Sequence, residues 1–323
     1  MDEKKILVTL QPNLKDIIHE HMVATLGKAG YTVKAIYSAE PVDEDTICRE
    51  IADCSGYIVG LEKVTARVLD AAPLLKCVTK FGVGTDNIDI PAAEQRGVEV
   101  ANCPGSNSNA VAEATIALVL NIARNVQNLC NDLRDKTFSV YVGNELAGKT
   151  VGILGFGNIG RKVAEYLKPF NTDTLAFDVY QDQAAADRLG VRYATLEEIF
   201  TQADYVTVHL PLTDETNHIV SSRLLNMAKT GLFLVNIARG GVVDENDLYQ
   251  AVQDGRIARA AVDVFEFEPP TASKMLTDDR FLVTPHIGAG TIEASFNMTN
   301  MSMDNLISVI EGKGNPFPVR SHR

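Results

Sequence analysis

The stretch TVGILGFGNIGRKVAEYL, residues 150–167, decides the fold. It opens with an apolar, β-branched run at 150–154, which predicts a buried strand, and closes with a helical pattern at 161–167. Between them stands G-x-G-x-x-G, at Gly155–Gly160. The bare motif is weak evidence, but here it lies between a strand and a helix, as a dinucleotide-binding turn requires. This context predicts a Rossmann βαβ unit.

The three glycines of this turn have separate physical roles. Gly155 permits the tight turn, Gly157 lets the backbone approach a pyrophosphate, and Gly160 lets the helix pack closely on the strand. The N-terminus of the following helix offers backbone amide donors and a positive dipole end to the phosphates. The sequence therefore predicts a dinucleotide site at this turn.

An acidic residue ends the next predicted strand, 174–177. Asp178 comes 18 residues after Gly160, close to the spacing of about 20 at which a carboxylate accepts hydrogen bonds from the ribose hydroxyls. Such a carboxylate repels a 2′-phosphate, and no arginine stands at 179–182 to neutralise one. These residues favour NAD over NADP.

Short apolar runs alternate with helical patterns along nearly the whole chain. Alternation of this kind is typical of parallel sheets covered by helices, the α/β class. The predicted strands cover 6–10, 32–37, 56–59 and 98–101 in a first series, then 150–154, 174–177, 205–208, 232–236, 260–264 and 281–283 in a second. A Pro-Gly turn within 102–107 separates the two series. A length of 323 residues also suits two domains.

The segment 109–125 that follows this turn predicts a helix that is apolar nearly all round. A helix with so little polar face is buried, either inside its own domain or in a subunit interface. The pattern alone leaves both alternatives open.

Composition excludes several classes of protein. A net charge of −12 argues against a nucleic-acid partner. No apolar run approaches the ~20 residues that span a bilayer, and the short run at 6–10 does not predict a signal peptide. The five cysteines are scattered without C-x-x-C, which favours reduced thiols and a cytoplasmic location. His19 and His21 do not share a helix face, so no metal site is expected.

Three segments after late predicted strands carry chemically competent side chains. Arg239 follows the strand at 232–236, and its planar fork can bind a carboxylate through two parallel hydrogen bonds. Glu268 lies in a loop with two prolines, and His286 lies in a Gly-rich turn after the strand at 281–283. Ligands of doubly wound sheets bind beyond the carboxyl ends of the strands, so we expect the three groups to share one cleft.

These groups match the needs of hydroxy-acid oxidation. Arg239 would orient the carboxylate so that C2 faces a nicotinamide, and His286 would accept the hydroxyl proton as hydride leaves. The unperturbed imidazole pKa of about 6.5 suits proton exchange at neutral pH. A neighbouring carboxylate such as Glu268 stabilises the imidazolium that ketone reduction requires.

Six ordered signatures together resemble the D-isomer-specific 2-hydroxyacid dehydrogenase family along nearly the whole chain. They are Phe81–Asp89, Asn102–Glu113, Gly155–Gly160, Ala238–Gly241, Asp263–Pro269 and Pro285–Gly288. The resemblance implies Arg239, Glu268 and His286 as the catalytic set, and substrate contacts by Lys80, Val83, Gly84 and Arg239. It also implies cofactor contacts by Gly155, Gly157, Asn158, Ile159, Gly160, Asp178, Leu210, Ile237, Ala238, Asp263 and Gly288.

The resemblance further implies how the two domains are arranged along the chain. A Rossmann NAD domain at 102–289 is inserted into a flavodoxin-like substrate domain formed by 1–101 and 290–323, and both are doubly wound parallel sheets. The two chain crossings can hinge the cleft closed. Family members are typically homodimers joined through the NAD domains, and the helix at 109–125 with the arm to Leu146 is similar to that interface.

Two branches of the family match most closely. The segment Lys80–Gly84 is similar to the 3-phosphoglycerate and the hydroxypyruvate/glyoxylate enzymes, and Lys80 falls where the former place a phosphate-binding base. However, Val59–Glu62 lacks the arginine of such enzymes, and Phe138–Tyr141 carries no base. A phosphate dianion needs charge-assisted donors, so a phosphorylated and an unphosphorylated acid remain alternatives.

Two other functions occur among proteins similar to this family. An NAD(H)-sensing, corepressor-like interaction protein is the alternative from another class, although the chain has only a short basic end at 320–323. Formate dehydrogenases replace the glutamate beside the histidine by glutamine, which Glu268 disfavours. Phosphite oxidation is not excluded by these residues.

Overall fold

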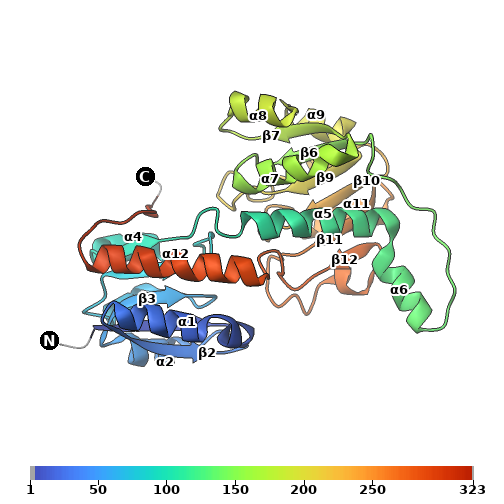
Figure 1. Cartoon of the computed structure of the whole chain (residues 1–323). Coiled ribbons are helices and arrows are strands. Elements are labelled where there is room, and N and C mark those ends of the chain that lie inside the picture. The colour runs from blue at the N-terminus through green and yellow to red at the C-terminus, as the bar shows by residue number, and fades with distance from the viewer. Residues whose placement is uncertain (1–3, 322–323) are drawn as a thin grey trace. The chain divides into compact units, whose positions relative to one another are not determined.

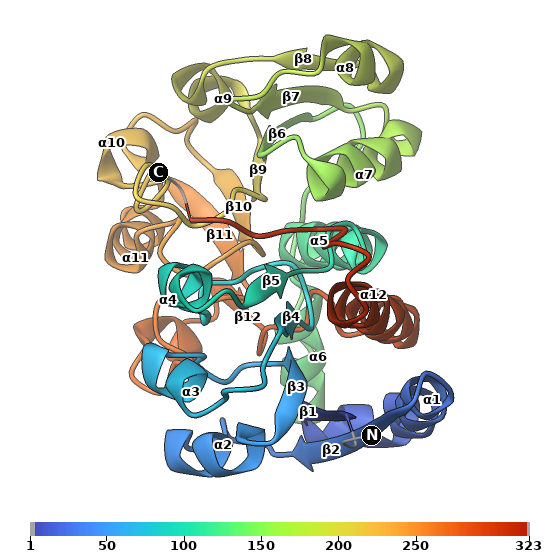
Figure 2. The same cartoon turned by 90° about the vertical axis from the view of Figure 1, so that its left-hand side faces the viewer.

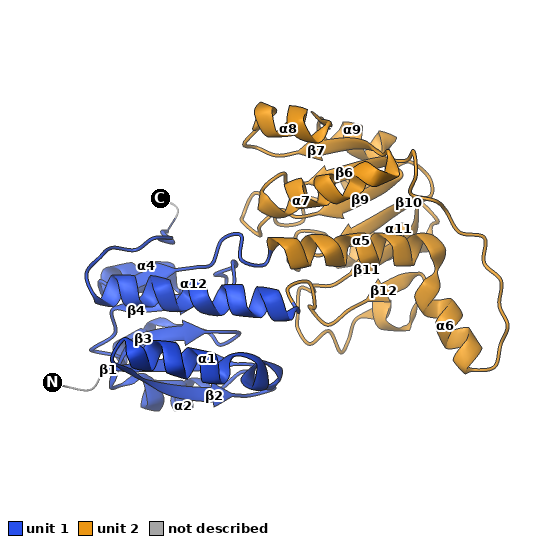
Figure 3. Cartoon of the chain, viewed as in Figure 1, with its two compact units in different colours: residues 1–107, 290–323 blue, residues 108–289 orange. Residues whose placement is uncertain are grey.

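The computed structural model describes residues 4–321 and contains two compact α/β units. Unit 1 is formed by Met1–Asn107 and Gly290–Arg323, and unit 2 by Ser108–Ala289 (Figure 3). Within the described residues, the paired strands of both sheets run parallel. The predicted fold class is therefore confirmed.

The sheet of unit 1 has the strand order β2-β1-β3-β4-β5, the order of flavodoxin-like folds. Its strands are β1 Lys4–Leu10, β2 Tyr31–Tyr37, β3 Cys54–Val59, β4 Cys77–Lys80 and β5 Glu99–Ala101. Its helices are α1 Lys15–Lys28, α2 Glu44–Ile51, α3 Ala66–Asp70, α4 Ile90–Gln95 and α12 Ile292–Ile310, with a 3-10 turn at Pro12–Leu14.

Helices cover both faces of the unit 1 sheet because successive side chains of β1 point to opposite faces. Ile6 and Val8 pack with α1 and α12, whereas Leu7 packs with α2, α3 and α4. Figure 2 shows these two helical layers on either side of the strands. The C-terminal helix α12 thus completes a domain whose strands all come from the first hundred residues or so.

The sheet of unit 2 has the order β12-β11-β10-β9-β6-β7-β8, which contains the doubly wound Rossmann order (Figure 1). Its strands are β6 Thr150–Leu154, β7 Asp173–Phe177, β8 Val191–Tyr193, β9 Tyr205–Val208, β10 Leu232–Asn236, β11 Ile257–Val262 and β12 Phe281–Val283. Its helices are α5 Ser108–Arg124, α6 Val126–Arg134, α7 Asn158–Leu167, α8 Gln183–Leu189, α9 Leu196–Gln202, α10 Ser222–Leu225 and α11 Glu245–Gln253, with 3-10 turns at Lys168–Phe170 and Lys274–Thr277.

Two buried layers hold this sheet. Side chains of α5, α7 and α8 pack on the face that carries Val151 and Ile153, and those of α9, α10 and α11 pack on the face that carries Leu154. The apolar helix α5 is therefore buried largely within its own domain, which is one of the two alternatives that its sequence leaves open. The strand order reverses between β6 and β9, the point where doubly wound sheets bind their ligands.

Several strands begin one to three residues away from the expected start, and the following differences matter more. Strands β4 and β8 are not among the predicted runs, and β11 ends at Val262 rather than at residue 264. The structure also groups 102–107 with unit 1 rather than with unit 2. The cause lies in the hydrogen bonds of these residues, because the Cys103 amide donates to the Gly82 carbonyl at 2.8 Å and the Asn305 amide group donates to the Asn102 carbonyl at 2.9 Å.

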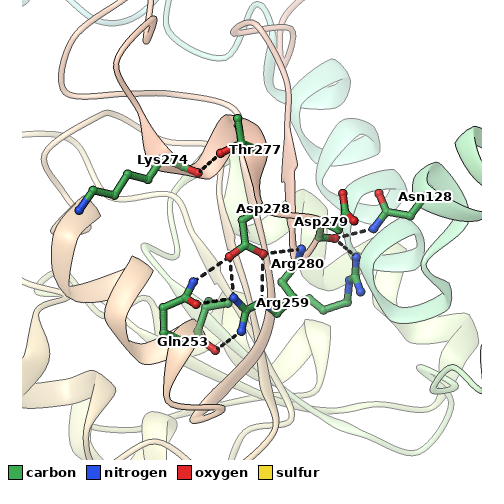
Figure 4. A network of polar contacts seen from close by, with 9 residues as sticks. Asn128, Gln253, Arg259, Lys274, Thr277, Asp278, Asp279 and Arg280 are labelled. Atoms are coloured by element: carbon green, nitrogen blue, oxygen red, sulfur yellow. Dashed lines mark hydrogen bonds and ion pairs between the residues drawn. The ribbon is translucent and has the colours of Figure 1, made fainter.

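A polar network fixes the start of β12, the strand that leads to His286 (Figure 4). Asp278 accepts hydrogen bonds from Arg280 Nη2 at 2.6 Å and from Gln253 Nε2 at 2.7 Å. The hydrogen bond from Arg280 is the main cause that lowers the pKa of Asp278. On the same loop, the Asp279 carbonyl accepts from Arg259 and from Asn128 of α6. The network joins α6, α11 and β12 into one framework.

Within residues 4–321, no helix is long and apolar enough to cross a membrane.

Candidate functional site

The predicted cofactor and catalytic residues of unit 2 lie at one edge of its sheet. Each follows the carboxyl end of a parallel strand, and the carboxyl ends of parallel strands meet at the same edge. The residues are Gly155–Gly160 after β6, Asp178 after β7, Leu210 after β9, Ile237, Ala238 and Arg239 after β10, Asp263 and Glu268 after β11, and His286 and Gly288 after β12.

The space around the three motif glycines agrees with their separate roles. A Cβ on Gly155, whose φ is +98°, would lie 2.7 Å from the His209 carbonyl carbon. A Cβ on Gly160 would lie 2.1 Å from the Gly155 oxygen, so this glycine is required for α7 to approach β6. A Cβ on Gly157 would meet nothing within 4 Å. The backbone at Gly157 is therefore open to a ligand.

The N-terminus of α7 is suited to an anion. Its N-cap is Gly157, which has no side chain to cap the first backbone amides. Ile237, Ala238 and Leu210 are buried nearby on the strand ends. An open glycine, an uncapped helix start and the Asp178 carboxylate fit the pyrophosphate and the ribose of a dinucleotide.

Asp178 supports the glycine turn through both of its carboxylate oxygens. Its Oδ2 accepts from the Phe156 amide at 2.7 Å, and its Oδ1 accepts from the Tyr180 amide at 2.9 Å. Each carboxylate oxygen has two lone-pair sites, so both can still accept a ribose hydroxyl.

We expect Asp178→Ala to weaken NADH binding by about tenfold or more, because a hydrogen bond to a charged group contributes about 1.5–3 kcal/mol. The preference for NADH over NADPH should fall as well, since the repulsion of a 2′-phosphate is removed. Fluorescence titration with both cofactors measures this. Asp187→Asn, on the exposed side of α8, is the control. An unchanged NADH Kd in Asp178→Ala would contradict the assignment.

Glu268 and His286 form a direct pair. The His286 Nδ1 lies 3.1 Å from Glu268 Oε2, and Glu268 Oε1 accepts from the Phe265 amide at 3.2 Å. Burial raises the pKa of the Glu268 carboxyl. The hydrogen bond and the charge interaction with His286 lower this pKa, as do the Phe265 amide and the positive charge of Arg239, and the net pKa lies below the ordinary one. Glu268 is therefore a carboxylate at neutral pH, and the charge of Arg239 acts on it.

Glu268→Gln should lower kcat for keto-acid reduction by about tenfold, because a neutral amide replaces the charged acceptor that holds His286 Nδ1. The Glu268 carboxylate is ionised above its lowered pKa, so the wild-type pair persists across the neutral range. Initial rates at neutral pH and saturating keto acid measure kcat. Glu197→Gln, which breaks an exposed ion pair with Arg223, is the control. An unchanged kcat in Glu268→Gln would argue against the pair.

Asp263 fixes the loop that carries His286. Its buried carboxylate accepts from the Thr284 hydroxyl at 2.6 Å and from the amides of Ile287 and Gly288 at 2.8 and 2.9 Å. His286 itself has φ +53°, in the left-handed region that non-glycine residues seldom adopt. Strained backbone of this kind is held only where the surrounding contacts over-determine it. The contacts of Asp263 supply that constraint.

The predicted substrate residues Lys80, Val83 and Gly84 belong to unit 1, where they lie at or after the end of β4. The Lys80 ammonium donates to the Gly60 carbonyl and to Asn87 Oδ1, the latter at 2.9 Å. The Val83 carbonyl accepts from Asn102 at 2.7 Å. Lys80 thus already binds the loop that follows β3.

Sequence reasoning did not single out His218, whose ring lies 3.0 Å from Glu266 in the Glu268 loop. The two residues are separated by 48 positions, and no spacing pattern connects a histidine in one loop with a glutamate in another. Only the folded arrangement shows this contact.

Comparison with known proteins agrees with this geometry. Residues 116–288 match the family model described as "D-isomer specific 2-hydroxyacid dehydrogenase, NAD binding domain". The chain belongs to the D-isomer-specific 2-hydroxyacid dehydrogenase family, and unit 2 is its NAD-binding domain.

Two curated relatives and one solved structure illustrate the similarity. D-3-phosphoglycerate dehydrogenase of Methanocaldococcus jannaschii is 36% identical over 96% of this chain and 58% of the relative. Hydroxypyruvate reductase of Thermotoga maritima is 37% identical over 80% of this chain and 85% of the relative. The crystal structure of the TT0316 protein from Thermus thermophilus has a TM-score of 0.87 and 30% identity over 98% and 99% of the two chains. The chain thus spans little more than half of the phosphoglycerate dehydrogenase.

Proposed function

We propose that the protein is an NAD-dependent oxidoreductase that interconverts a small D-2-hydroxy acid and its 2-keto acid. The observation that carries this proposal is the Glu268–His286 pair, 3.1 Å apart, with the charge of Arg239 acting on the same carboxylate. The three residues follow β11, β12 and β10, which are neighbours in the sheet and end at the edge that also carries the dinucleotide turn.

Each residue has one role in the proposed reaction. The nicotinamide, when bound, accepts or donates the hydride. Arg239 binds the substrate carboxylate through its planar fork and so orients C2. His286 exchanges a proton with the oxygen on C2, and Glu268 holds its ring through Nδ1, which leaves Nε2 for the substrate.

We propose an unphosphorylated acid of the hydroxypyruvate or glyoxylate type as the preferred substrate. The relatives are named for both hydroxypyruvate and 3-phosphoglycerate, so their names leave the choice open. A phosphate dianion needs charge-assisted donors. Lys80 is the expected donor, but its ammonium binds Gly60 and Asn87, and the nearby Glu62 carboxylate is buried and accepts a hydrogen bond from Thr9. These contacts favour a substrate without a phosphate.

Steady-state oxidation of NADH with a panel of 2-keto acids tests the proposal. We expect turnover with hydroxypyruvate and glyoxylate, and a lower kcat/KM with 3-phosphohydroxypyruvate. A higher kcat/KM with the phosphorylated acid would overturn the substrate assignment alone. Tight NADH binding without turnover on any keto acid would overturn the enzyme and would favour the NAD(H)-sensing alternative.

We further propose a homodimer that forms through unit 2. The segment that follows α6 exposes Phe138, Val140 and Val142 at 87%, 84% and 90% of their surfaces, and Leu133 at the end of α6 is also exposed. A run of large exposed apolar side chains is costly in water and marks an interaction surface. We assign a second copy as its occupant because this arm extends directly from α5 and α6 of the NAD-binding domain.

All five cysteines are free thiols, which suits a reducing compartment such as the cytoplasm.

The double variant Phe138→Asp and Val140→Asp should convert the dimer to a monomer, because two charges would have to be desolvated in the interface. Light scattering on a sizing column measures the mass, with 35.1 kDa for one copy. Val179→Asp is the matched control, since Val179 is 76% exposed outside this arm. A monomeric wild type, or a double variant that stays dimeric, would contradict this interface.

A further inference from the structure

A second histidine lies among carboxylates beside the Glu268 loop. The Nδ1 of His218 lies 3.2 Å from Asp244 Oδ2, and its Nε2 lies 3.0 Å from Glu266 Oε1. Ionised carboxylate oxygens only accept hydrogen bonds, so both contacts are satisfied when both ring nitrogens carry a proton. Among the described residues, no His, Cys, Asp and Glu side chains form a group able to hold a metal ion. One imidazole ring thus contacts a carboxylate at each of its two nitrogens.

One end of this link is fixed to a rigid element. Asp244 is the N-cap of α11, and its Oδ1 accepts from the amides of Asn246 and Asp247 at 3.0 and 2.9 Å. The His218 amide donates to the Gly241 carbonyl at 2.7 Å, next to the loop that carries Arg239. His218 is thus held against both the start of α11 and the Arg239 loop.

The other end of the link is the loop that carries Glu268. Glu266 lies two residues before Glu268, and its amide donates to Glu245 Oε1 at 2.6 Å. On the other side of the loop, the Phe265 carbonyl passes so close to Gly240 that a Cβ there would lie 1.9 Å away. The loop is therefore positioned by backbone contacts on one side and by the His218–Glu266 contact on the other.

The link lies among several negatively charged side chains. Burial raises the pKa of Glu245, and the negative charges of Glu266, Asp244 and Glu268 raise it further, against the lowering effect of the Glu266 amide. These four carboxylates repel one another at short range. His218 contacts two of them and so offsets the repulsion that would push the Glu266 side of the loop away from α11.

We propose that His218 is a positioning residue that, by joining Asp244 to Glu266, holds the loop in the conformation that presents Glu268 to His286. This inference rests on the proposed function, because its readout is turnover. Its two ring contacts are with Asp244 and with Glu266, two residues before Glu268, so its side chain would act on the catalytic pair through the Glu268 loop.

His218→Asn is the test variant. Asparagine tolerates the left-handed φ of +51° at this position but cannot donate from two ring nitrogens. We expect kcat for the best keto acid to fall by about tenfold, because small misplacement of a catalytic group is costly to the rate, while NADH affinity stays within twofold.

A double-mutant cycle separates positioning from general destabilisation. In the Glu268→Gln background, His218→Asn should cause no further loss, because residues that act through one group are not additive. Glu266→Gln, which replaces the charged acceptor of the same link by a neutral amide, should cause a smaller loss of kcat in the same direction and serves if His218→Asn fails to fold. Arg223→Gln, which breaks an exposed ion pair between α9 and α10, is the matched control and should leave kcat within twofold.

Two outcomes would overturn the inference. One is wild-type kcat in both His218→Asn and Glu266→Gln, and the other is a full additional loss in the Glu268→Gln background. Either can be told apart from a failure of the proposed function, in which the wild-type protein itself would not oxidise NADH with any keto acid.

Discussion

Replacing His286 by alanine is expected to lower kcat for keto-acid reduction by about 10²- to 10⁴-fold, the usual contribution of a positioned acid or base. The imidazole is the group that the Glu268 carboxylate holds at 3.1 Å, and alanine has no proton to exchange. NADH affinity should change little, because Asp178 and the glycine turn remain. Steady-state kinetics and a fluorescence titration of the same samples measure both quantities.

The control for this prediction is another histidine of the chain. His21 bonds to Asn300 within unit 1, far along the sequence from the proposed site, so His21→Ala should keep wild-type turnover. If His286→Ala turned over its best keto acid at the wild-type rate, the acid/base assignment would be wrong.

Replacing Arg239 by alanine is expected to raise KM for the keto acid by about 10²-fold or more, because each charge-assisted hydrogen bond contributes about 1.5–3 kcal/mol and the fork supplies two. Arg239→Lys should restore only part of the affinity, since an ammonium is a point charge and cannot imitate the parallel pair. KM for NADH should remain near the wild-type value.

Arg256 offers a matched control for Arg239. It also lies in a loop of unit 2, where its guanidinium donates to the Ala228 carbonyl, so Arg256→Lys should leave both KM values unchanged. A complete rescue by Arg239→Lys would mean that the substrate carboxylate is bound by charge alone. An unchanged KM in Arg239→Ala would remove Arg239 from the substrate site.

Much of this fold follows from local rules that can be applied to the sequence. The turn at Gly155–Gly160 was predictable because each glycine answers a steric demand, and a Cβ at Gly160 would overlap the Gly155 oxygen. Asp178 was predictable because its distance from the turn is set by the length of one helix and one strand. Long apolar runs such as Leu232–Asn236 became strands with the expected bounds.

The missed elements lack such local signals. Strand β8 has three residues at the edge of its sheet, and β4 holds the polar Thr79 in a fully buried position. Residues 102–107 read as a linker, yet their backbone and side chains bond to the first unit. The partners of His218 come from loops far away in the chain, so only folding brings them together.

The left-handed backbone at His286 also has a practical consequence. Asparagine adopts this conformation more readily than alanine, whose cost there is about 1–2 kcal/mol. A His286→Asn protein would therefore keep the native backbone conformation of this loop but would lose the group that exchanges a proton with the substrate. Such a protein would hold reduced dinucleotide and keto acid together without consuming them, and crystals of that stalled ternary complex would reveal which acid this site binds.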